Sequence, residues 1–357
     1  MRGAAFAAGV AALAALLAGG GGGRASLYSP DDPFAVPVGS DGKPAPLPFD
    51  EFKRRLAVLT NALVEPKAGE KPNPDRARFL DRIAKQEKVP KRTAPEAAAL
   101  ATDLLRVGQS DRALGVLGPH AADRRPDYFV FTGLASAHAA RGEWADALRY
   151  HQEGQFDTKM PETVKGLSKG QRDWWARLDA DAVPRFYQIR RQETEERRGL
   201  GPAERHAADE TEDVLPLFPL SGEPVRFVNA AGEYEAGVLA PAEQAKLPPD
   251  ALATVQQLVL WFPGDTRLYW LLAELYAAAG DVRAAAQILD ECTWGRQYGN
   301  RKVLVAHRHA LRAAADALDR VEPLEGPAFG LGTIGVYFGV VGALAVLALV
   351  RTVLKRR

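Results

Sequence analysis

The stretch that decides the fold is residues 94–155, in which one pattern occurs twice. The first copy reads Leu100, Ala101, Leu104, Gly108, Ala113 and Leu117, and the second reads Leu134, Ala135, His138, Gly142, Ala147 and His151. Gly108 and Gly142 lie 34 residues apart, and the other positions keep that offset. Apolar and small residues at helical spacing on both sides of each glycine predict two helices joined by a short turn. Because neither helix can bury its apolar face alone, neighbouring copies must stack.

A third copy lies far downstream, with Gly280 at the turn. It comprises Tyr269, Leu272, Ala273, Tyr276, Gly280, Ala285 and Leu289. Residues 266–291 therefore predict a full repeat, and residues 249–261 predict half of a preceding one. A 34-residue period of this kind resembles the tetratricopeptide repeat, in which each unit is a pair of antiparallel helices. The resemblance covers about a third of the chain and implies a mainly α repeat solenoid that binds other proteins.

In tetratricopeptide proteins the first helices line a concave groove, and the resemblance implies which residues would form it here. They are Phe129, Thr132 and Ser136 in the second copy and Arg267, Trp270 and Glu274 in the third. Trp270 lies between residues of opposite charge, and interfaces often use such an aromatic side chain as an anchor. The alternative is that Trp270 packs in the core against the segment at residues 225–240. The repeat pattern does not identify a particular partner protein.

The composition excludes several classes of function. A formal net charge of +1 is too balanced to favour binding to nucleic acid. The single cysteine, Cys292, excludes an intrachain disulfide framework, and its place in a second helix predicts a buried small hydrophobe. The zinc, haem, phosphate-loop and nucleophile-elbow signatures are all missing, so we expect no cofactor, no metal, no catalytic residue and no enzyme. His138 and His151 occupy packing positions of the repeat, which favours core histidines over metal ligands.

Both ends of the chain read as targeting or membrane segments. Residues 1–25 combine Arg2, an apolar run and a glycine-rich end, which predicts a cleaved export signal, with an uncleaved anchor as the alternative. Residues 329–350 form an uncharged apolar run of 22 residues, long enough to cross ~30 Å of hydrocarbon. The tail at 351–357 is basic and holds no acid, which places it in the cytoplasm by the positive-inside rule. The two ends together predict a single-pass protein of the bacterial inner membrane whose repeat region faces the periplasm.

Three small residues share one face of the predicted spanning helix. Gly335 and Gly339 form a G-x-x-x-G pair, and Ala343 continues it. This spacing suits close packing of two helices in a membrane, although glycine is also common in single spanning helices. The pattern therefore does not decide between a homodimer through this face and a spanning helix without a partner.

The remaining segments complete the expected order of domains. They are a proline-rich linker at 26–49, a helical cap at 50–92, the paired repeats at 93–158, a helical and loop segment at 159–224, a β-hairpin insertion at 225–240, and repeats with a closing helix at 241–321. The hairpin rests on the alternation of apolar and polar residues around the turn at 230–232. It serves either as a decoration of the binding face or as a short packing flap.

The segment at 159–224 contains adjacent tryptophans, Trp174 and Trp175. A charged helix is expected at 183–198, with a loop at 199–219. Adjacent tryptophans can mark a ligand or membrane-surface site, but a core position with one ring covering a helix seam is the commoner arrangement.

These expectations converge on a membrane-anchored scaffold that faces the periplasm and mediates protein–protein interaction or the assembly of an envelope complex. The alternative is a subunit of an envelope enzyme that uses the repeats for docking and holds its site within 159–239. A pocket there with converging Asp, Glu or His side chains would favour the enzyme subunit, and a packed seam would favour the scaffold. A third possibility is a structural membrane protein that dimerises through its spanning helix.

Overall fold

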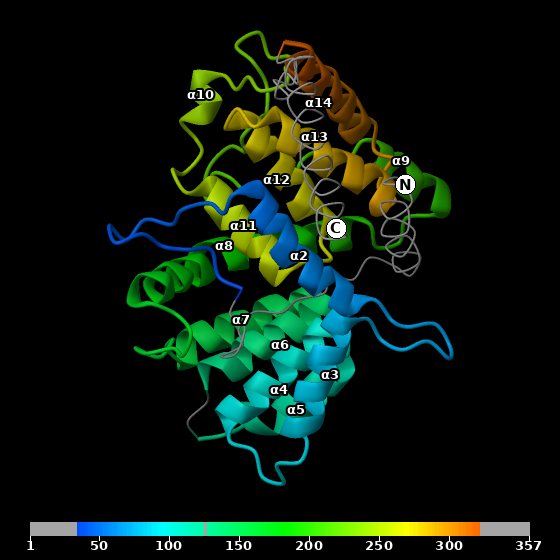
Figure 1. The fold of residues 1–357 in the computed structure, drawn as a ribbon. Coiled ribbons are helices and arrows are strands. Elements are labelled where there is room, and N and C mark those ends of the chain that lie inside the picture. The colour runs from blue at the N-terminus through cyan, green and yellow to red at the C-terminus, as the bar shows by residue number, and fades with distance from the viewer. Residues whose placement is uncertain (1–33, 125–126, 322–357) are drawn as a thin grey trace, which may run out of the picture. The chain divides into compact units, whose positions relative to one another are not determined.

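The computed structural model describes residues 34–124 and 127–321, and in them the chain is mainly helical (Figure 1). The helices are α2 (Phe49–Leu63), α3 (Pro74–Gln86), α4 (Ala94–Arg106), α5 (Ser110–Ala121), α6 (Tyr128–Ala140), α7 (Trp144–Asp157), α8 (Lys169–Glu196), α9 (Pro202–Glu210), α10 (Pro241–Gln244), α11 (Ala251–Trp261), α12 (Thr266–Ala278), α13 (Val282–Asp290), the π-helix η1 (Glu291–Gly295) and α14 (Lys302–Val321). The mainly α class is confirmed. The chain divides into two units, Met1–Arg312 and Ala313–Arg357, and all contacts described below lie within the first.

Three glycines close the turns of the three repeat copies in the same way. Gly108, Gly142 and Gly280 have φ values of 77°, 75° and 89°, a left-handed conformation that glycine adopts without strain. Each glycine N–H donates to the carbonyl three residues earlier, at 3.0, 3.0 and 2.9 Å. The N–H of the next residue donates to the carbonyl five residues earlier, at 2.8, 3.0 and 2.9 Å. These are the two hydrogen bonds of the Schellman motif, so the three predicted helix–turn–helix units are confirmed.

The helices pack in chain order. Within the copies, α4 packs on α5, α6 on α7 and α12 on α13; between them, α3 packs on α4, α5 on α6, α7 on α8, α8 on α11 and α11 on α12. Glycines permit the closest approaches. A Cβ at Gly154 of α7 would lie 2.8 Å from Cβ of Phe131 on α6, and one at Gly133 would lie 2.9 Å from Cδ1 of Leu117. Small residues therefore set the spacing of the helix axes, as the repeat pattern predicts.

The helix expected at 183–198 is part of a longer one, because α8 runs unbroken for 28 residues with Pro184 inside it. Ser168 caps its start by accepting a hydrogen bond from the Gln171 N–H. Helix α8 packs on both α7 and α11, and these contacts hold it together across the proline. Helix α8 therefore connects the packing of α7 to that of α11.

Both tryptophans of the adjacent pair are core residues at the junction of α8 and α11. Trp174 and Trp175 are buried. The rings of Trp175 and Trp261 meet edge to face, with centroids 5.0 Å apart, and Trp175 Nε1 donates to Gln257 Oε1 at 3.3 Å. The core interpretation of the pair is the one that the structure favours.

The expected hairpin at 225–240 is wrong, since the described residues contain no strand there and only an isolated bridge between Glu235 and Val238. Two tight turns lie so close together in the sequence that the residues between them are too few to form a ladder of strand hydrogen bonds. Gly232 and Gly237 both take left-handed φ values, and the Asn229 Oδ1 accepts from the N–H groups of Ala231 and Glu233. The segment is a looped insertion between α8 and α11, and the preceding stretch at 199–219, expected as a loop, contains α9.

The described part of the proline-rich segment, from Phe34 onward, is extended and anchored. Two buried glutamine side chains of α11 hydrogen-bond to its backbone, each both as an acceptor and as a donor. Gln257 Oε1 accepts from the Val36 N–H at 2.8 Å, and Gln256 Oε1 accepts from the Leu47 N–H at 2.7 Å. The amide nitrogens of the same glutamines donate back to the carbonyls of Phe34 and Leu47. Four long-range hydrogen bonds thus fix a segment whose composition alone suggests a free linker.

Several expectations fall outside the described residues. These are the export signal at 1–25, the spanning helix at 329–350, the tail at 351–357, and the packing face of Gly335, Gly339 and Ala343. Among the helices that the structure does describe, none combines the length and the apolarity that crossing a bilayer requires.

Candidate functional site

A cleft of about 710 Å³ opens between the C-terminal half of α8, the segment at 197–228 and the first turns of α12 and α14. Its apolar wall includes Ile189, Leu200, Val214, Phe227 and Val303. Charged side chains from the same elements interrupt this wall. A concave site with apolar walls and a few polar groups is the usual form of a binding pocket.

Glu212 is the electrostatic centre of the cleft wall. Its Oε1 accepts from Arg267 Nη1 at 2.8 Å and from Arg197 Nη2 at 2.7 Å. Its Oε2 accepts from Arg301 Nε at 2.9 Å and from the Tyr298 hydroxyl. Burial by itself would raise the pKa of Glu212, but Arg267 and the bonds from Tyr298 and Arg301 outweigh it and leave the pKa at about 2. Glu212 is therefore ionised at neutral pH.

Arg267 joins this centre to α8. Its Nη1 also donates to Glu193 Oε1 at 2.6 Å, and its Nη2 donates to the carbonyl of Asp213 at 2.8 Å. Glu193, Arg197, Glu212 and Arg267 are consequently engaged with one another, and their charges balance. This network fixes the stretch after α9 to α8 and α12 and so holds the cleft wall in place.

A second cluster surrounds the buried carboxylate of Glu274, which is 1% exposed. Trp270 Nε1, the Tyr234 hydroxyl and His307 Nδ1 each lie 3.0 Å from a carboxylate oxygen. A ring nitrogen that hydrogen-bonds to a carboxylate oxygen carries a proton, so Nδ1 of His307 is the donor in this contact. The His307 ring stacks on Tyr234 with centroids 3.5 Å apart, and His307 lines the cleft.

The predicted groove residues lie mostly in the interior. Exposure is 5% for Arg267, 0% for Trp270, 5% for Thr132 and 0% for Ser136, and the sixth position, Phe129, is half-buried. The hydroxyls of Thr132 and Ser136 donate to helix carbonyls, at 3.2 and 2.7 Å. Trp270 packs against His307 beside the insertion, which is the core alternative for this residue. These side chains form no open surface, and their role in binding a partner stays a prediction.

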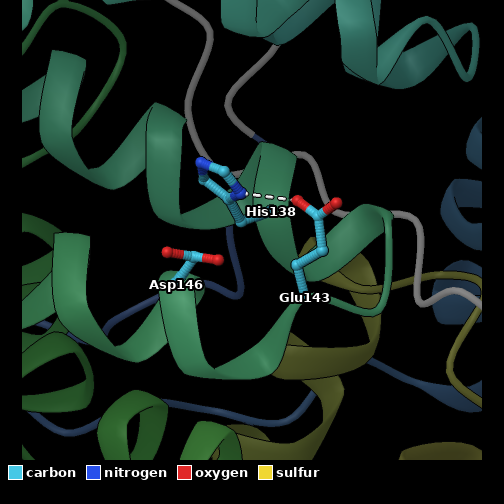
Figure 2. Close-up of side chains that lie close together, drawn as sticks. All are labelled: His138, Glu143 and Asp146. Carbon is cyan, nitrogen blue, oxygen red and sulfur yellow. Dashed lines mark hydrogen bonds and ion pairs between the residues drawn. The ribbon is translucent and has the colours of Figure 1, made fainter.

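One trio of side chains has the composition of a metal site. His138 at the end of α6, and Glu143 and Asp146 at the start of α7, bring one ligand atom each within 4.8 Å of one another (Figure 2). His138 Nδ1 lies 2.7 Å from Glu143 Oε2. Arg141 and Arg149, however, pair with Glu143 and Asp146 at 2.8 and 3.1 Å.

These pairs explain the trio without a metal ion. The acids lie at a helix N-terminus, where their negative charge complements the helix dipole. Two guanidinium groups already neutralise the carboxylates, so the site offers little attraction to a cation. His151, the other histidine of this copy, is buried and bonded through Nε2 to the carbonyl of Asp179 at 2.8 Å, which agrees with a core role.

Sequence reasoning missed the cleft. Arg185, Glu212 and His307 belong to no motif, and Glu212 lies in a stretch expected to be a loop. The only possible signal is a histidine that faces an acid on another helix. That contact can be recognised only once the fold is known. Comparison with known proteins finds no match to a protein-family model, to a curated protein or to a solved structure.

Proposed function

We propose that this chain is a tetratricopeptide-like scaffold that binds a partner protein, anchored in the inner membrane with its repeats facing the periplasm. The observation that carries the proposal is the set of three helix–turn–helix units with the same pair of cap hydrogen bonds. Units that stack in this way form extended surfaces whose main use is protein binding. The apolar run at 329–350 and the basic tail support the anchor and its orientation.

The cleft is the proposed binding surface, because the groove positions taken from the repeat pattern are mostly buried. It offers apolar walls for side chains and a polar rim for a backbone, and it is bounded by the insertion that distinguishes this chain from a plain repeat stack. An assembly factor of this design would hold one segment of its partner while its own anchor keeps the complex at the membrane.

A pair of cross-linking positions tests the surface. Gln192 is exposed and lines the cleft, whereas Gln152 is exposed on α7 and does not line it. A photo-reactive amino acid at position 192 should give discrete protein adducts in intact membranes, and the same group at position 152 should not. Equal labelling from both positions, or none from position 192, would exclude the cleft as the binding surface.

A reporter fusion tests the orientation. An enzyme that is active only in the periplasm, fused just before Phe329, should be active if the repeats are exported. Activity of a cytoplasm-only reporter at the same position would refute the proposed topology.

A second candidate, a subunit of an envelope enzyme, is favoured by the cleft itself. Acid side chains converge within 159–239, and buried Glu274 orients His307 much as a carboxylate orients a general base. Turnover of a chromogenic acyl or phosphoryl ester that is lost in His307→Asn would support this candidate. The scaffold is preferred because the carboxylates Glu193 and Glu212 are already bound by arginines.

A further inference from the structure

Trp294 is the one tryptophan of the chain that is open to solvent. All six tryptophans lie in residues that the structure describes, and five of them are at most 4% exposed, whereas Trp294 is 66% exposed. Tryptophan is highly buried on average, because its ring carries a large apolar area. A ring left outside a core that holds the other five is therefore a candidate for contact with something outside the chain.

The exposed ring stands on a packed element of the fold. Trp294 belongs to the π-helix η1, in which Cys292, Thr293 and Gly295 are buried. Such π-helical turns are rare, and they occur frequently at functional sites. Because its three neighbours are fixed in the core, the exposure of Trp294 is set by the backbone of the turn and not by a loose loop.

A cation lies against the same ring. The guanidinium carbon of Arg308 on α14 is 5.0 Å from the centre of the Trp294 ring. Arg312, one turn further on, pairs with Asp290 at 3.1 Å, whereas Arg308 donates only to the neutral acceptor His309 Nε2, at 2.8 Å, among the residues that the structure describes. Its positive charge is therefore available to an anion.

The surroundings of Trp294 favour a lipid surface over a protein partner. A protein interface has an apolar core built from several side chains. The other exposed large apolar side chains of the described residues lie outside η1 and α13, and α14 holds only Leu318 near its far end. A single indole ring beside a basic residue is instead typical of the membrane interface, where the ring meets the upper acyl chains and the cation meets the phosphates.

The chain itself brings a bilayer within reach of this ring. Helix α14 is the last one described, and the predicted spanning segment at 329–350 follows it. The part of α14 beyond Arg308 is about 20 Å long at the helical rise per residue. A connection of the length of 322–328 reaches at most about 25 Å, so it allows α14 to lie along the surface of the bilayer.

We propose that Trp294 and Arg308 form a membrane contact, with the indole ring in the headgroup region of the bilayer and the guanidinium on a lipid phosphate. This inference rests on the proposed membrane-anchored function and specifies which face of the repeat unit meets the lipid. A spanning helix alone leaves the repeat unit free to turn about its tether. A second contact of this kind restricts that freedom and presents the same face of the unit to its partner.

Fluorescence quenching by brominated lipid tests the contact. The segment at 329–350 contains no tryptophan and the other five rings are buried, so the quenching reports on Trp294. The full chain is reconstituted into phosphatidylglycerol-containing vesicles, with or without bromine in the upper acyl chains. Bromine should remove up to about one sixth of the parent's emission if the six rings emit equally, and this loss should be absent in Trp294→Phe. Arg308→Gln should weaken the contact about fivefold, as expected for one basic residue at an anionic surface.

The matched control moves the exposed ring to another helix. Phe156 on α7 is 90% exposed, so Trp294→Phe combined with Phe156→Trp keeps six tryptophans and one exposed ring. Emission from this double variant should be quenched by aqueous iodide and not by brominated lipid. Equal lipid quenching in the control and the parent would overturn the inference, because exposure alone would then suffice.

The outcomes separate this inference from the function on which it rests. A chain that floats with the vesicles but shows no lipid quenching overturns the membrane contact and leaves the anchor intact. A ring shielded from both bromine and iodide also overturns it, in favour of a covering protein surface. A chain that does not float refutes the anchor, and the membrane contact with it. Melting curves of the variants by circular dichroism show whether each one is folded.

Discussion

Glu212→Gln is the substitution for which the structure gives the clearest magnitude. It keeps the shape of the side chain and removes the charge that three guanidinium groups share, those of Arg197, Arg267 and Arg301. The pKa of Glu212 is about 2 in the folded chain against an ordinary value of 4.5. That difference corresponds to about 3 kcal/mol of folding free energy at neutral pH. We expect the variant to lose stability on this order, because Arg267 stays buried with one carboxylate fewer.

The sign of the pH dependence follows from the direction of the shift. A carboxyl whose folded pKa is lowered contributes its full stability above the unfolded pKa, near 4.5, and loses it as the pH falls towards about 2. The parent should therefore lose stability through this window. The variant has no carboxyl to titrate at this position and should show a shallower decline.

Urea unfolding followed by tryptophan fluorescence measures both effects, since Trp174 and Trp270 are buried. The control is Glu196→Gln, which removes the same charge from an exposed position of the same cleft and should leave stability near the parent's. If Glu212→Gln unfolds at the parent's urea midpoint at pH 7, the charge network contributes nothing. If the deficit does not shrink towards pH 2, the lowered pKa is not its cause.

The other predictions concern packing. Gly154→Ala should cost ~1–3 kcal/mol, since its new methyl meets Cβ of Phe131 at 2.8 Å and that atom cannot rotate away. Gly133→Ala should stay near the parent, because Cδ1 of Leu117 is the end of a flexible side chain; equal urea midpoints for the two variants would refute this contrast. Trp270→Ala should lower stability by ~3–5 kcal/mol as a core truncation. An unchanged melting temperature with loss of a bound partner would instead return Trp270 to the role of an exposed anchor.

The local features of the fold could be predicted from the sequence because they depend on short-range spacing. Helix α14 ends at the last residue of the segment expected to hold a closing helix, and the turn glycines were recognisable from a repeated offset. The helix expected to begin at Val183 begins at Lys169 instead, for a physical reason. Packing against helices distant in sequence compensates the hydrogen bond that proline removes, and no local pattern reports such packing.

The cleft could not be predicted because its groups meet only through the fold. Glu212 and Arg301, which share a hydrogen bond, are separated by 89 residues, and Tyr234 and Glu274 by 40. Acidic and basic residues alternate along the chain without forming a motif, so the sequence predicts that they lie on a solvated surface. The same holds for Gln256 and Gln257, which look like ordinary helix residues and yet bind the backbone at Val36 and Leu47.

The segment between α8 and α11 also explains why Arg267 and Glu274, predicted groove residues of the third copy, are buried. Arg267 is covered by Glu212 and by the carbonyl of Asp213, and Glu274 is covered by the hydroxyl of Tyr234. All three covering residues lie between α8 and α11, in the segment that a plain repeat stack lacks. Arg267 and Glu274 thus bind a segment of their own chain. In the scaffold proposed above, the partner uses the opening that this segment leaves, which is the cleft lined by Arg185 and His307.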